Sequence, residues 1–465
     1  MTLTVFRNTP QRPILWALSF LISYFSFLIS PAQPLAFPGA EGFGKFTVGG
    51  RGGRVIAVTN LNDDGPGSLR DAVSQQGART VIFRISGTIE LLSPLRINND
   101  SITIAGQTAP GDGICLKDYP LVVNASEVIV RYMRVRVGDK MARDYDALSG
   151  GRYGQHHVVL DHVSVSYSID ECLSIYKTRD MTVQWCLVSH SLSRSRHTKG
   201  AHGFGGIWGG YNATFHHNLL ANHSSRNPRF SSVEGTKNVD YRNNVVYNWG
   251  FKSAYGGGRH GEINMVANYY KPGPASQHHR LLDVADDGTG RYYLEANVME
   301  GDDAVSRDNW SAVGGKKPDS CHADKPFAFM PITPHNAREA YEAVVASVGC
   351  SHRRDSYDRE VIRQMTAGTA TWGRNGIIDT PEEAGGWPVL QQAPAPQDTD
   401  GDGMPDAWEQ AHGLNSDDAT DGILCTLNPD YTNLEVWINS LTSPNSFKLL
   451  PTPSNSYEDL RVLFG

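Results

Sequence analysis

Short segments with apolar residues at alternate positions recur between residues 100 and 300. A period of two is the pattern of β-strands that bury one face. Seven such segments are VIVRYMRV (128–135), VVLDHVSV (158–165), TVQWCLVS (182–189), TFHHNLLA (214–221), DYRNNVVY (240–247), NMVANYY (264–270) and YLEANVME (293–300). Similar points of these segments are occupied, at intervals of 24 to 32 residues, by Tyr132, His162, Cys186, Asn218, Asn244, Asn268 and Asn297. A repeat of this length predicts a solenoid.

Turns rather than helices separate the strands, which predicts an all-β, right-handed parallel β-helix. No single coil can bury its apolar face alone, so the coils are expected to stack. Asparagines at equivalent positions are then expected to form a ladder of side-chain amide hydrogen bonds inside the turns. A β-sandwich is the alternative architecture, and the lack of tight Asn-Gly hairpin signals between the strands disfavours it.

The pattern changes after residue 300. A capping box from Asn336 to Glu339 predicts a helix that Gly349 ends, and a second short helix is expected over residues 357–365. Both are expected to pack on an end or a flank of the solenoid. The predicted organisation is a signal peptide (1–32), a β-helix catalytic domain (33–310), a helical and loop extension (311–388), a Pro-rich linker (389–397) and a small C-terminal calcium-loop module (398–465).

The N-terminus has the features of a secretion signal. Arg7 and Arg12 precede an apolar stretch over 14–29, and Ser30 and Ala32 offer small residues at a cleavage site. A retained membrane anchor is the alternative, because the apolar stretch is long. We therefore expect a secreted monomer with no membrane partner after cleavage.

Composition adds two expectations. The net charge of −7 over 465 residues argues against nucleic acid as a partner, because phosphate binding needs a basic field. Six cysteines suit an oxidising compartment, and Cys321 and Cys350, which flank a predicted helix, are expected to pair. Sequons for glycosylation, relevant only in a eukaryotic host, start at Asn99, Asn124, Asn212, Asn222 and Asn309.

The stretch DTDGDGMPDAWE (398–409) has the ligand spacing of a calcium loop. Gly403 stands at position 6, where the loop turns. The expected ligands are Asp398, Asp400, Asp402, the Met404 carbonyl, Asp406 and Glu409. A solvated acidic turn is the alternative. Because residues 428–441 lack a second acidic series, we expect one structural Ca²⁺ in an EF-hand-like module.

Charged residues of both signs cluster in the solenoid. Stacked coils can align Asp146, Asp170 and Arg226 on one groove, with Asp144 and Glu171 as further acids. The stretch 193–210 adds Arg194, Arg196, His197 and Lys199. Acidic residues in such a groove can hold calcium while basic residues meet an anionic ligand, which suits an acidic polymer.

Four motifs resemble a pectate lyase of polysaccharide lyase family 1, over about residues 36–310. They are AFPGAEGFG (36–44), VTNLNDDGPGSLRDAV (58–73), LDHVSVSYSIDE (160–171) and HHNLLANHSSRNPR (216–229). The resemblance implies calcium-assisted β-elimination of α-1,4-linked galacturonan (polygalacturonate, pectin), giving unsaturated products. It makes Arg226 the base and Arg229 and Lys199 substrate-binding residues. Asp146 and Asp170 would hold the catalytic Ca²⁺, with Asp144 and Glu171 as alternatives.

The chain departs from the family pattern at two positions. Ser174 stands where the family often has an aspartate, for which Glu171 or a water is expected to compensate. Ser231 stands where it often has an arginine, for which Arg229 or Arg242 is expected to serve.

An arginine base must lose a proton that the guanidinium normally keeps. Neighbouring positive charge and burial favour the neutral form. No acidic residue neighbours Arg226 in the sequence, so we expect its guanidinium to be free of a salt bridge and the pH optimum to be alkaline.

Three rival functions remain open: a calcium-independent pectin lyase on methylated pectin, a polygalacturonase that uses paired carboxylates, and a non-catalytic protein that binds acidic glycans. Asp161 and His162 are interpreted as a structural pair, and His216 and His217 as turn or core residues. Trp185 and Trp249 are either core residues or sugar platforms.

Overall fold

The computed structural model describes Met1 and residues 33–141, 143–151 and 154–442. The predicted signal peptide and the last part of the predicted C-terminal module, from residue 443 on, lie outside the described residues. All the elements below belong to one compact unit that begins at Leu35. None of the helices in the described ranges is long and apolar enough to span a membrane.

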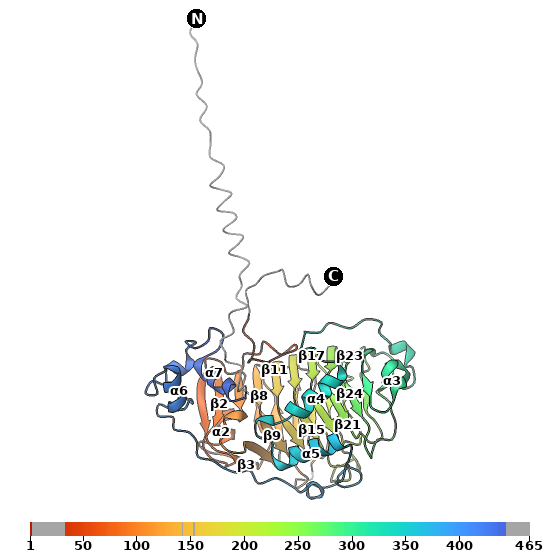
Figure 1. The fold of residues 1–465 in the computed structure, drawn as a ribbon, viewed down its shortest axis with the longest axis horizontal. Coiled ribbons are helices and arrows are strands. Elements are labelled where there is room, and N and C mark those ends of the chain that lie inside the picture. The colour runs from red at the N-terminus through yellow and green to blue at the C-terminus, as the bar shows by residue number, and fades with distance from the viewer. Residues whose placement is uncertain (2–32, 142, 152–153, 443–465) are drawn as a thin grey trace. The chain divides into compact units, whose positions relative to one another are not determined.

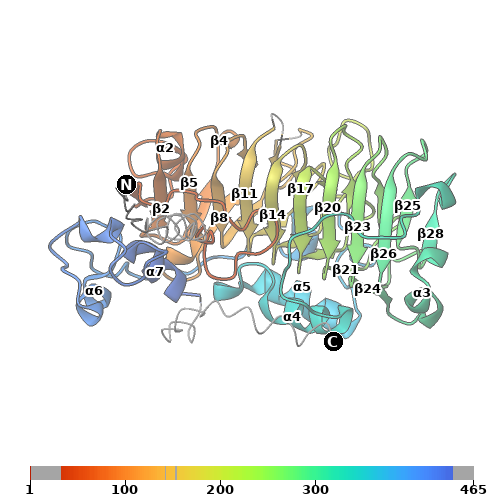
Figure 2. The same ribbon diagram turned by 90° about the horizontal axis from the view of Figure 1, so that it is seen from above.

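Three sheets enclose one apolar core (Figure 1, Figure 2). Sheet A contains, in spatial order, β1 (Arg54–Val58), β2 (Arg79–Phe83), β5 (Ile102–Ala105), β8 (Val128–Arg131), β11 (His156–Asp161), β14 (Arg179–Gln184), β17 (Tyr211–His216), β20 (Lys237–Arg242), β23 (Glu262–Val266) and β26 (Arg291–Glu295). Sheet B contains β3 (Gly87–Glu90), β6 (Ile114–Lys117), β9 (Met133–Arg136), β12 (Ser164–Ser166), β15 (Leu187–Ser189), β18 (Leu219–Ala221), β21 (Val245–Tyr247), β24 (Tyr269–Lys271) and β27 (Val298–Met299). Sheet C contains β4 (Leu95–Ile97), β7 (Leu121–Val123), β10 (Leu148–Gly150), β13 (Leu173–Ile175), β16 (Ile207–Trp208), β19 (Arg229–Phe230), β22 (Ala254–Gly256), β25 (Leu282–Val284) and β28 (Val313–Gly314).

The chain visits sheets A, B and C in turn, and each strand pairs in parallel with the equivalent strand of the next coil. The predicted right-handed parallel β-helix is confirmed. Inward side chains stack along its axis, as Trp208 does on Phe215 with ring centroids 4.6 Å apart. Trp249 is fully buried in the same core, so it is a core residue and not a sugar platform.

The predicted asparagine ladder is present between sheets A and B. Asn218 donates its Nδ2 to Oδ1 of Asn244 (2.9 Å), Asn244 to Asn268 (3.1 Å) and Asn268 to Asn297 (2.8 Å). Asn309 ends the ladder by accepting from Asn297 at 3.0 Å. Each rung satisfies buried backbone groups at the turn, so the ladder helps to define the stacking of the coils.

Tyr132 and His162 do not occupy the ladder position, because Met133 and Val163 follow them there. They stack outside the turn with Trp185 and His217, at centroid distances of 4.7, 5.9 and 4.3 Å. All four residues of this outer stack have left-handed φ values of 52 to 54°. Trp185 therefore serves as a stacking residue between coils.

Six α-helices and six short 3₁₀ turns decorate the described part of the solenoid. The α-helices are α2 (Leu69–Ser74), α3 (Asp303–Arg307), α4 (Ala337–Ser347), α5 (Ser356–Ala367), α6 (Asp406–His412) and α7 (Asn433–Ser440). The 3₁₀ turns are Gly106–Thr108, Asn309–Ala312, Asp319–Cys321, Ser351–Arg353, Pro381–Ala384 and Asp421–Ile423. Figure 2 shows α4 and α5 along one side and α6 and α7 at the end that carries β2.

Helices α4 and α5 pack on the outer side of sheet B, and α4 begins with the predicted capping box. Two buried arginines of β9 bind acids at the start of α5: Nη1 of Arg136 lies 2.7 Å from Asp355, and Nε of Arg134 lies 3.1 Å from it. Arg136 also bonds Asp358 at 2.9 Å. The helical extension is thus joined to the solenoid by buried ion pairs as well as apolar contacts.

The predicted disulfide is wrong. Cys321 lies in a turn whose neighbour His322 forms a bridge with Tyr292 of β26, whereas the Cys350 thiol contacts the Met133 carbonyl of β9. These strands belong to coils far apart along the axis, because α4 runs back along the solenoid. All six cysteines are free. Burial raises the pKa of the Cys350 thiol to about 11.

The C-terminal segment lies directly on the first coils. In the predicted linker, the Gln391 carbonyl accepts from the Asp112 N–H (3.0 Å), and the Gln391 N–H donates to the Asp112 carboxylate (2.8 Å). Beyond it, an apolar cluster on sheet A joins Ile82 and Ala105 with Met404, Leu434, Trp437 and Ile438. The segment therefore covers the outer face of β2 and β5.

Candidate active site

Except for Arg194, Arg196 and His197, which are not part of its lining, the charged residues predicted for a groove line one cavity, of about 460 Å³, on sheet C. They come from loop ends that immediately precede the strands of this sheet: residues 144 and 146 before β10, 170 and 171 before β13, and 226 before β19. The lining includes Asp144, Asp146, Asp170, Glu171, Lys199, Arg226 and Arg229. Strand stacking thus brings together side chains more than 80 residues apart in the sequence.

Asp146, Asp170 and Glu171 form an acidic cluster with one oxygen of each carboxylate within 4.8 Å of the others. Burial and the charge of Asp170 raise the pKa of Asp146 well above its usual range. Burial also acts to raise the pKa of Asp170, but the hydrogen bond and charge of His202 outweigh it and lower the pKa. Repelling carboxylates of this kind suit a hard cation that accepts oxygen ligands.

Asp144 lies outside this cluster and supports the loop that follows. Its carboxylate accepts hydrogen bonds from the backbone N–H (2.9 Å) and the hydroxyl of Thr198, and His197 lies 3.6 Å away. Those contacts lower the pKa of Asp144 in spite of partial burial.

A pair of stacked histidines closes one side of the cluster, and sequence reasoning missed its second member. The rings of His197 and His202 are parallel with centroids 3.8 Å apart, and both side chains are buried. Nε2 of His202 lies 2.6 Å from Asp170. The only signal in the sequence was the density of polar residues in 193–204.

Arg226 is held from three sides at the floor of the groove. Its backbone is left-handed (φ 60°), and the residue lines the cavity. Its guanidinium lies 4.4 Å from the Phe204 ring and donates from Nε to the Tyr255 hydroxyl at 3.2 Å. Its Nη1 contacts the Glu171 carboxylate.

The contact with Glu171 contradicts the expectation that Arg226 has no acidic partner. The acid comes from another coil. Phe204 forms a parallel β-bridge with Glu171 on one side and a second one with Ser225, the neighbour of Arg226, on the other side. Gly205 permits this close approach, since a Cβ there would lie 2.4 Å from the Arg226 carbonyl oxygen. Neither Phe204 nor Tyr255 was predicted as a site residue.

The two departures from the family pattern are both filled by buried serines. Ser174 accepts a hydrogen bond from the Ile207 N–H at 3.1 Å and bonds Asp146, whose pKa it lowers against the larger effect of burial. Ser231 is pressed against Gly209, where a Cβ would lie 2.6 Å from the serine Cβ. Arg242 cannot compensate for Ser231, because it lies on sheet A, where its Nε and Nη2 both bond the Asp240 carboxylate.

The C-terminal loop gathers a second acidic cluster. Carboxylate oxygens of Asp398, Asp400 and Asp402 lie within 4.8 Å of one another, and so do those of Asp402, Glu409 and Asp421. Buried oxygens of Asp400, Asp402, Glu409 and Asp421 have no hydrogen-bond partner within the described residues. Burial and neighbouring acids raise the pKa values of Asp402 and Glu409 to about 7. Buried carboxylates left in this state fit a bound cation.

Two residues of this cluster differ from the expectation. Asp406 does not face the others, because its carboxylate accepts from the N–H and hydroxyl of Thr399, both at 2.7 Å. Asp421, from outside the twelve-residue loop, was not predicted, and only its place in the acidic stretch 417–421 hinted at it. For Met404, the side chain packs in the apolar cluster on sheet A.

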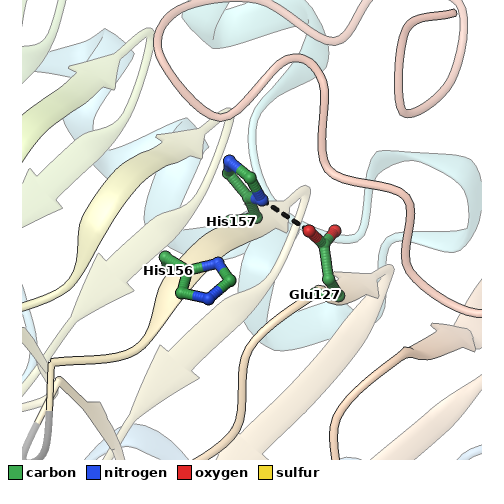
Figure 3. Close-up of side chains that lie close together, drawn as sticks. All are labelled: Glu127, His156 and His157. Carbon is green, nitrogen blue, oxygen red and sulfur yellow. Dashed lines mark hydrogen bonds and ion pairs between the residues drawn. The ribbon is translucent and has the colours of Figure 1, made fainter.

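A third cluster, shown in Figure 3, lies at the start of β11 and has a structural explanation. Nδ1 of His157 lies 2.5 Å from one oxygen of Glu127, whose other oxygen accepts from the Val48 N–H at 2.7 Å. His156 stands beside them, exposed (Figure 3). Both Glu127 oxygens are therefore engaged, one with His157 of sheet A and the other with the N-terminal segment at Val48.

Histidines and acids on sheet A have a similar role. Asp161 binds His162 and Arg131, each at 2.8 Å, which confirms the structural pair. His216 and His217 are buried and bond one another at 2.8 Å, as expected of core residues. Burial lowers their pKa values to about 3 and about 2.

Comparison with known proteins shows which family the chain resembles over most of its length. No protein-family model matches it. It is 36% identical over 444 residues to the probable pectate lyase C of Aspergillus flavus, covering 92% of this chain and 98% of that protein. The probable pectate lyase C of Aspergillus fumigatus is 35% identical over 438 residues, covering 90% and 97%.

The chain belongs to the pectate lyase family.

As a pectate lyase it is a polysaccharide lyase. The crystal structure of jun a 1, the major allergen from cedar pollen, shares the fold at a TM-score of 0.51 and 16% identity, covering 67% of this chain and 92% of the allergen. Because the match to the Aspergillus flavus relative covers 92% of this pectate lyase, the residues outside it are too few to make up the whole C-terminal segment from residue 389 on, so the similarity reaches into that segment.

The motifs of the pectate lyase resemblance have distinct places in the fold. Residues 36–44 cross sheet A, where the Gly44 N–H donates to Thr182 at 2.9 Å. Residues 160–171 lead from β11 to the acidic cluster, and residues 216–229 lead from β17 to Arg226. Two of the four motifs thus end in the groove of the lyase, and residues 58–73 lead from the end of β1 into α2.

Proposed function

We propose that the enzyme is secreted and cleaves polygalacturonate, the unesterified form of pectin, by β-elimination in the groove on sheet C. The observation that carries the proposal is the contact of the Arg226 guanidinium with the acidic cluster inside one cavity. A groove with both signs of charge suits an acidic polymer that shares a cation with the protein. Its relatives are named pectate lyases, which agrees with this substrate.

Asp146, Asp170 and Glu171 are the residues that would hold Ca²⁺, because their carboxylates converge and are partly desolvated. When bound, the ion would ligate the uronate carboxylate and withdraw electrons from it, which acidifies the proton on C5. His202 keeps Asp170 in place from the other side, at 2.6 Å.

Arg226 is the base in this proposal. Neutral Arg226 takes the C5 proton, the C5–H electron pair forms the C4–C5 double bond, and the C4–O bond breaks. The departing oxygen leaves with the electron pair and is protonated from water. Phe204 and Tyr255 fix the guanidinium, while Arg229 and Lys199, which line the same cavity, neutralise other uronate carboxylates.

Glu171 contacts the Arg226 guanidinium in the groove. A cation bound by the acidic cluster would compete for the Glu171 carboxylate and would free the guanidinium to face the substrate. Access to the base is therefore coupled to occupation of the groove. Because an arginine base must lose a proton, we expect an alkaline optimum.

Unmethylated substrate is favoured over methylated pectin by the same cluster. A methyl ester carries no charge, so it cannot share a cation with the acidic cluster. Binding of a methylated substrate would not explain why three acids lie together beside Arg226. A calcium-independent pectin lyase or a non-catalytic glycan-binding protein would leave the cluster without a use.

The test is a lyase assay that follows the ultraviolet absorbance of the unsaturated product on polygalacturonate and on methylated pectin, with and without Ca²⁺. Wild type and Arg226→Gln are compared, and Arg338→Gln on the exposed start of α4 is the matched control. We expect Arg226→Gln to lose activity by a factor of about 100 to 10,000 and Arg338→Gln to retain it. Unchanged turnover in Arg226→Gln would overturn the assignment of the base.

The C-terminal acidic cluster complicates a simple chelation experiment. We propose that Asp398, Asp400, Asp402, Glu409 and Asp421 hold a second, structural Ca²⁺, with the Met404 carbonyl as an expected further ligand. The calcium requirement of the groove is therefore measured in Glu409→Gln, in which the second site is impaired. A requirement that disappears in this variant would assign the calcium effect to the C-terminal site instead of the groove.

A further inference from the structure

The floor of the groove is a single row of outward side chains on sheet C. Strand register pairs each with the next: Arg96 with Val122, Val122 with Ser149, Ser149 with Ser174, and Ile207 with Arg229. Ser174 and Ile207 are joined by the hydrogen bond from the Ile207 N–H. Between Arg96 and Arg229 the row holds small or apolar residues, and beyond Arg229 the register continues to Tyr255 and Asp283.

Arg96 points outward, because it is exposed between the buried Leu95 and Ile97. It lines the same cavity as Arg226 and Arg229. Within the described residues, the Arg96 guanidinium makes no ion pair or hydrogen bond, and that of Arg229 lies only over the Tyr255 ring, at 5.8 Å. Both guanidinium groups are thus available to a ligand.

The register fixes how far apart these two groups stand. From β4 to β19 there are five strand steps, which at about 4.8 Å each amount to about 24 Å. The acidic cluster, on the coils of β10 and β13, lies between them. A guanidinium fork matches a carboxylate with two parallel hydrogen bonds.

We propose that Arg96 forms a remote subsite for a carboxylate of the same polyuronate chain, several sugar units from the bond that is cleaved. This inference rests on the proposed function, since it takes the polymer from the catalytic Arg226 past Arg229 and along the row toward Arg96. A long substrate then contacts guanidinium groups at both ends of the groove, while a short one reaches only Arg226 and Arg229. Arg96 is accordingly a determinant of preference for long chains.

The experiment compares KM for polygalacturonate with KM for trigalacturonate at saturating Ca²⁺, in wild type, Arg96→Gln and Arg338→Gln. For Arg96→Gln we expect the ratio of polymer to trimer KM to rise about two- to fivefold, the size of one exposed ion pair. Arg338→Gln, which removes the same charge above sheet B, should leave the ratio unchanged. Arg96→Lys, which keeps the charge but not the fork, should fall between.

An unchanged ratio in Arg96→Gln would overturn the subsite, and so would an equal rise in Arg338→Gln, because that would be an effect of net charge. Absence of lyase activity in the wild type would refute the proposed function and not the subsite. In that case, retardation of the protein in a gel that contains polygalacturonate still tests Arg96, with reduced retardation expected for Arg96→Gln relative to Arg338→Gln.

Discussion

Replacement of one asparagine in the buried ladder offers a direct measure of what stacks the coils. Asn244 is fully buried in the middle of the ladder, and leucine is its closest apolar match in shape. In Asn244→Leu, the β-helix keeps its apolar core but loses the amide that links two coils. We expect a large fall in the free energy of unfolding.

The hydrogen bonds of Asn244 set the magnitude. Its Oδ1 accepts from the N–H (3.0 Å) and the Nδ2 (2.9 Å) of Asn218, and its Nδ2 donates to the Phe215 carbonyl (2.9 Å) and to Oδ1 of Asn268 (3.1 Å). Leucine leaves the first three groups without that partner, at about 1 to 3 kcal/mol each, while the Asn268 oxygen keeps the Asn244 N–H at 2.9 Å. The apolar side chain returns about 1.5 to 3 kcal/mol. At the middle of both ranges the net loss is about 4 kcal/mol, a large part of the stability of a typical domain.

Equilibrium urea unfolding, followed by far-ultraviolet circular dichroism, measures this loss as a fall in the midpoint. Asn98→Leu is the matched control, because Asn98 is exposed and makes one side-chain contact, with Asn124 at 3.2 Å. We expect that variant to lose less than about 0.5 kcal/mol. Equal losses in the two variants, or a loss below about 1 kcal/mol in Asn244→Leu, would refute the view that the ladder stabilises coil stacking.

Two further predictions concern pH and calcium. Burial lowers the pKa of His223 to about 4, below its value in the unfolded chain, so its contribution to stability is complete above about pH 6.5 and is lost as the pH falls toward 4. In urea unfolding, the free energy of unfolding of wild type minus that of His223→Asn should therefore shrink by about 2 kcal/mol between about pH 7.5 and about pH 5. A difference that stays constant over this range would show that the histidine can be protonated in the folded protein without cost. In a thermal melt, added Ca²⁺ should raise the Tm of wild type more than that of Glu409→Gln, because Glu409 has two buried oxygens without a hydrogen-bond partner within the described residues. Equal increases in Tm for the two proteins would exclude the C-terminal cluster as a structural calcium site.

The repeat allowed the solenoid to be predicted, because alternation within each strand and equivalent asparagines are local properties of the sequence. Uneven loop lengths made the alignment of coils uncertain, and Tyr132 and His162 were therefore placed one residue away from their true positions. The disulfide prediction failed for a related reason. Closeness in sequence to one helix said nothing about the coils against which Cys321 and Cys350 would pack.

The candidate site was predictable as a set but not in its contacts. Asp146, Asp170 and Arg226 meet because each precedes a strand of the same sheet, which follows from stacking. The contact of Glu171 with Arg226 depends on the position of Phe204, which pairs with residues on both sides. Asp421 joins the C-terminal cluster from a turn that lies outside the twelve-residue spacing of the calcium loop. Such contacts are set by loops that fold against the finished solenoid, so no short sequence pattern encodes them.

The position of the C-terminal segment has a consequence for biosynthesis. Arg84 is bound to Asp398 across 314 residues of sequence, and Ile82 packs against Met404 and Leu434. The first coils are thus finished by residues that are made more than 300 residues later. Coils can stack as the chain emerges, yet the apolar outer face of β2 stays uncovered until residues 398–438 have been synthesised. That delay leaves an interval in which this face of the solenoid is incompletely closed, and it makes these contacts the slow, long-range step of maturation.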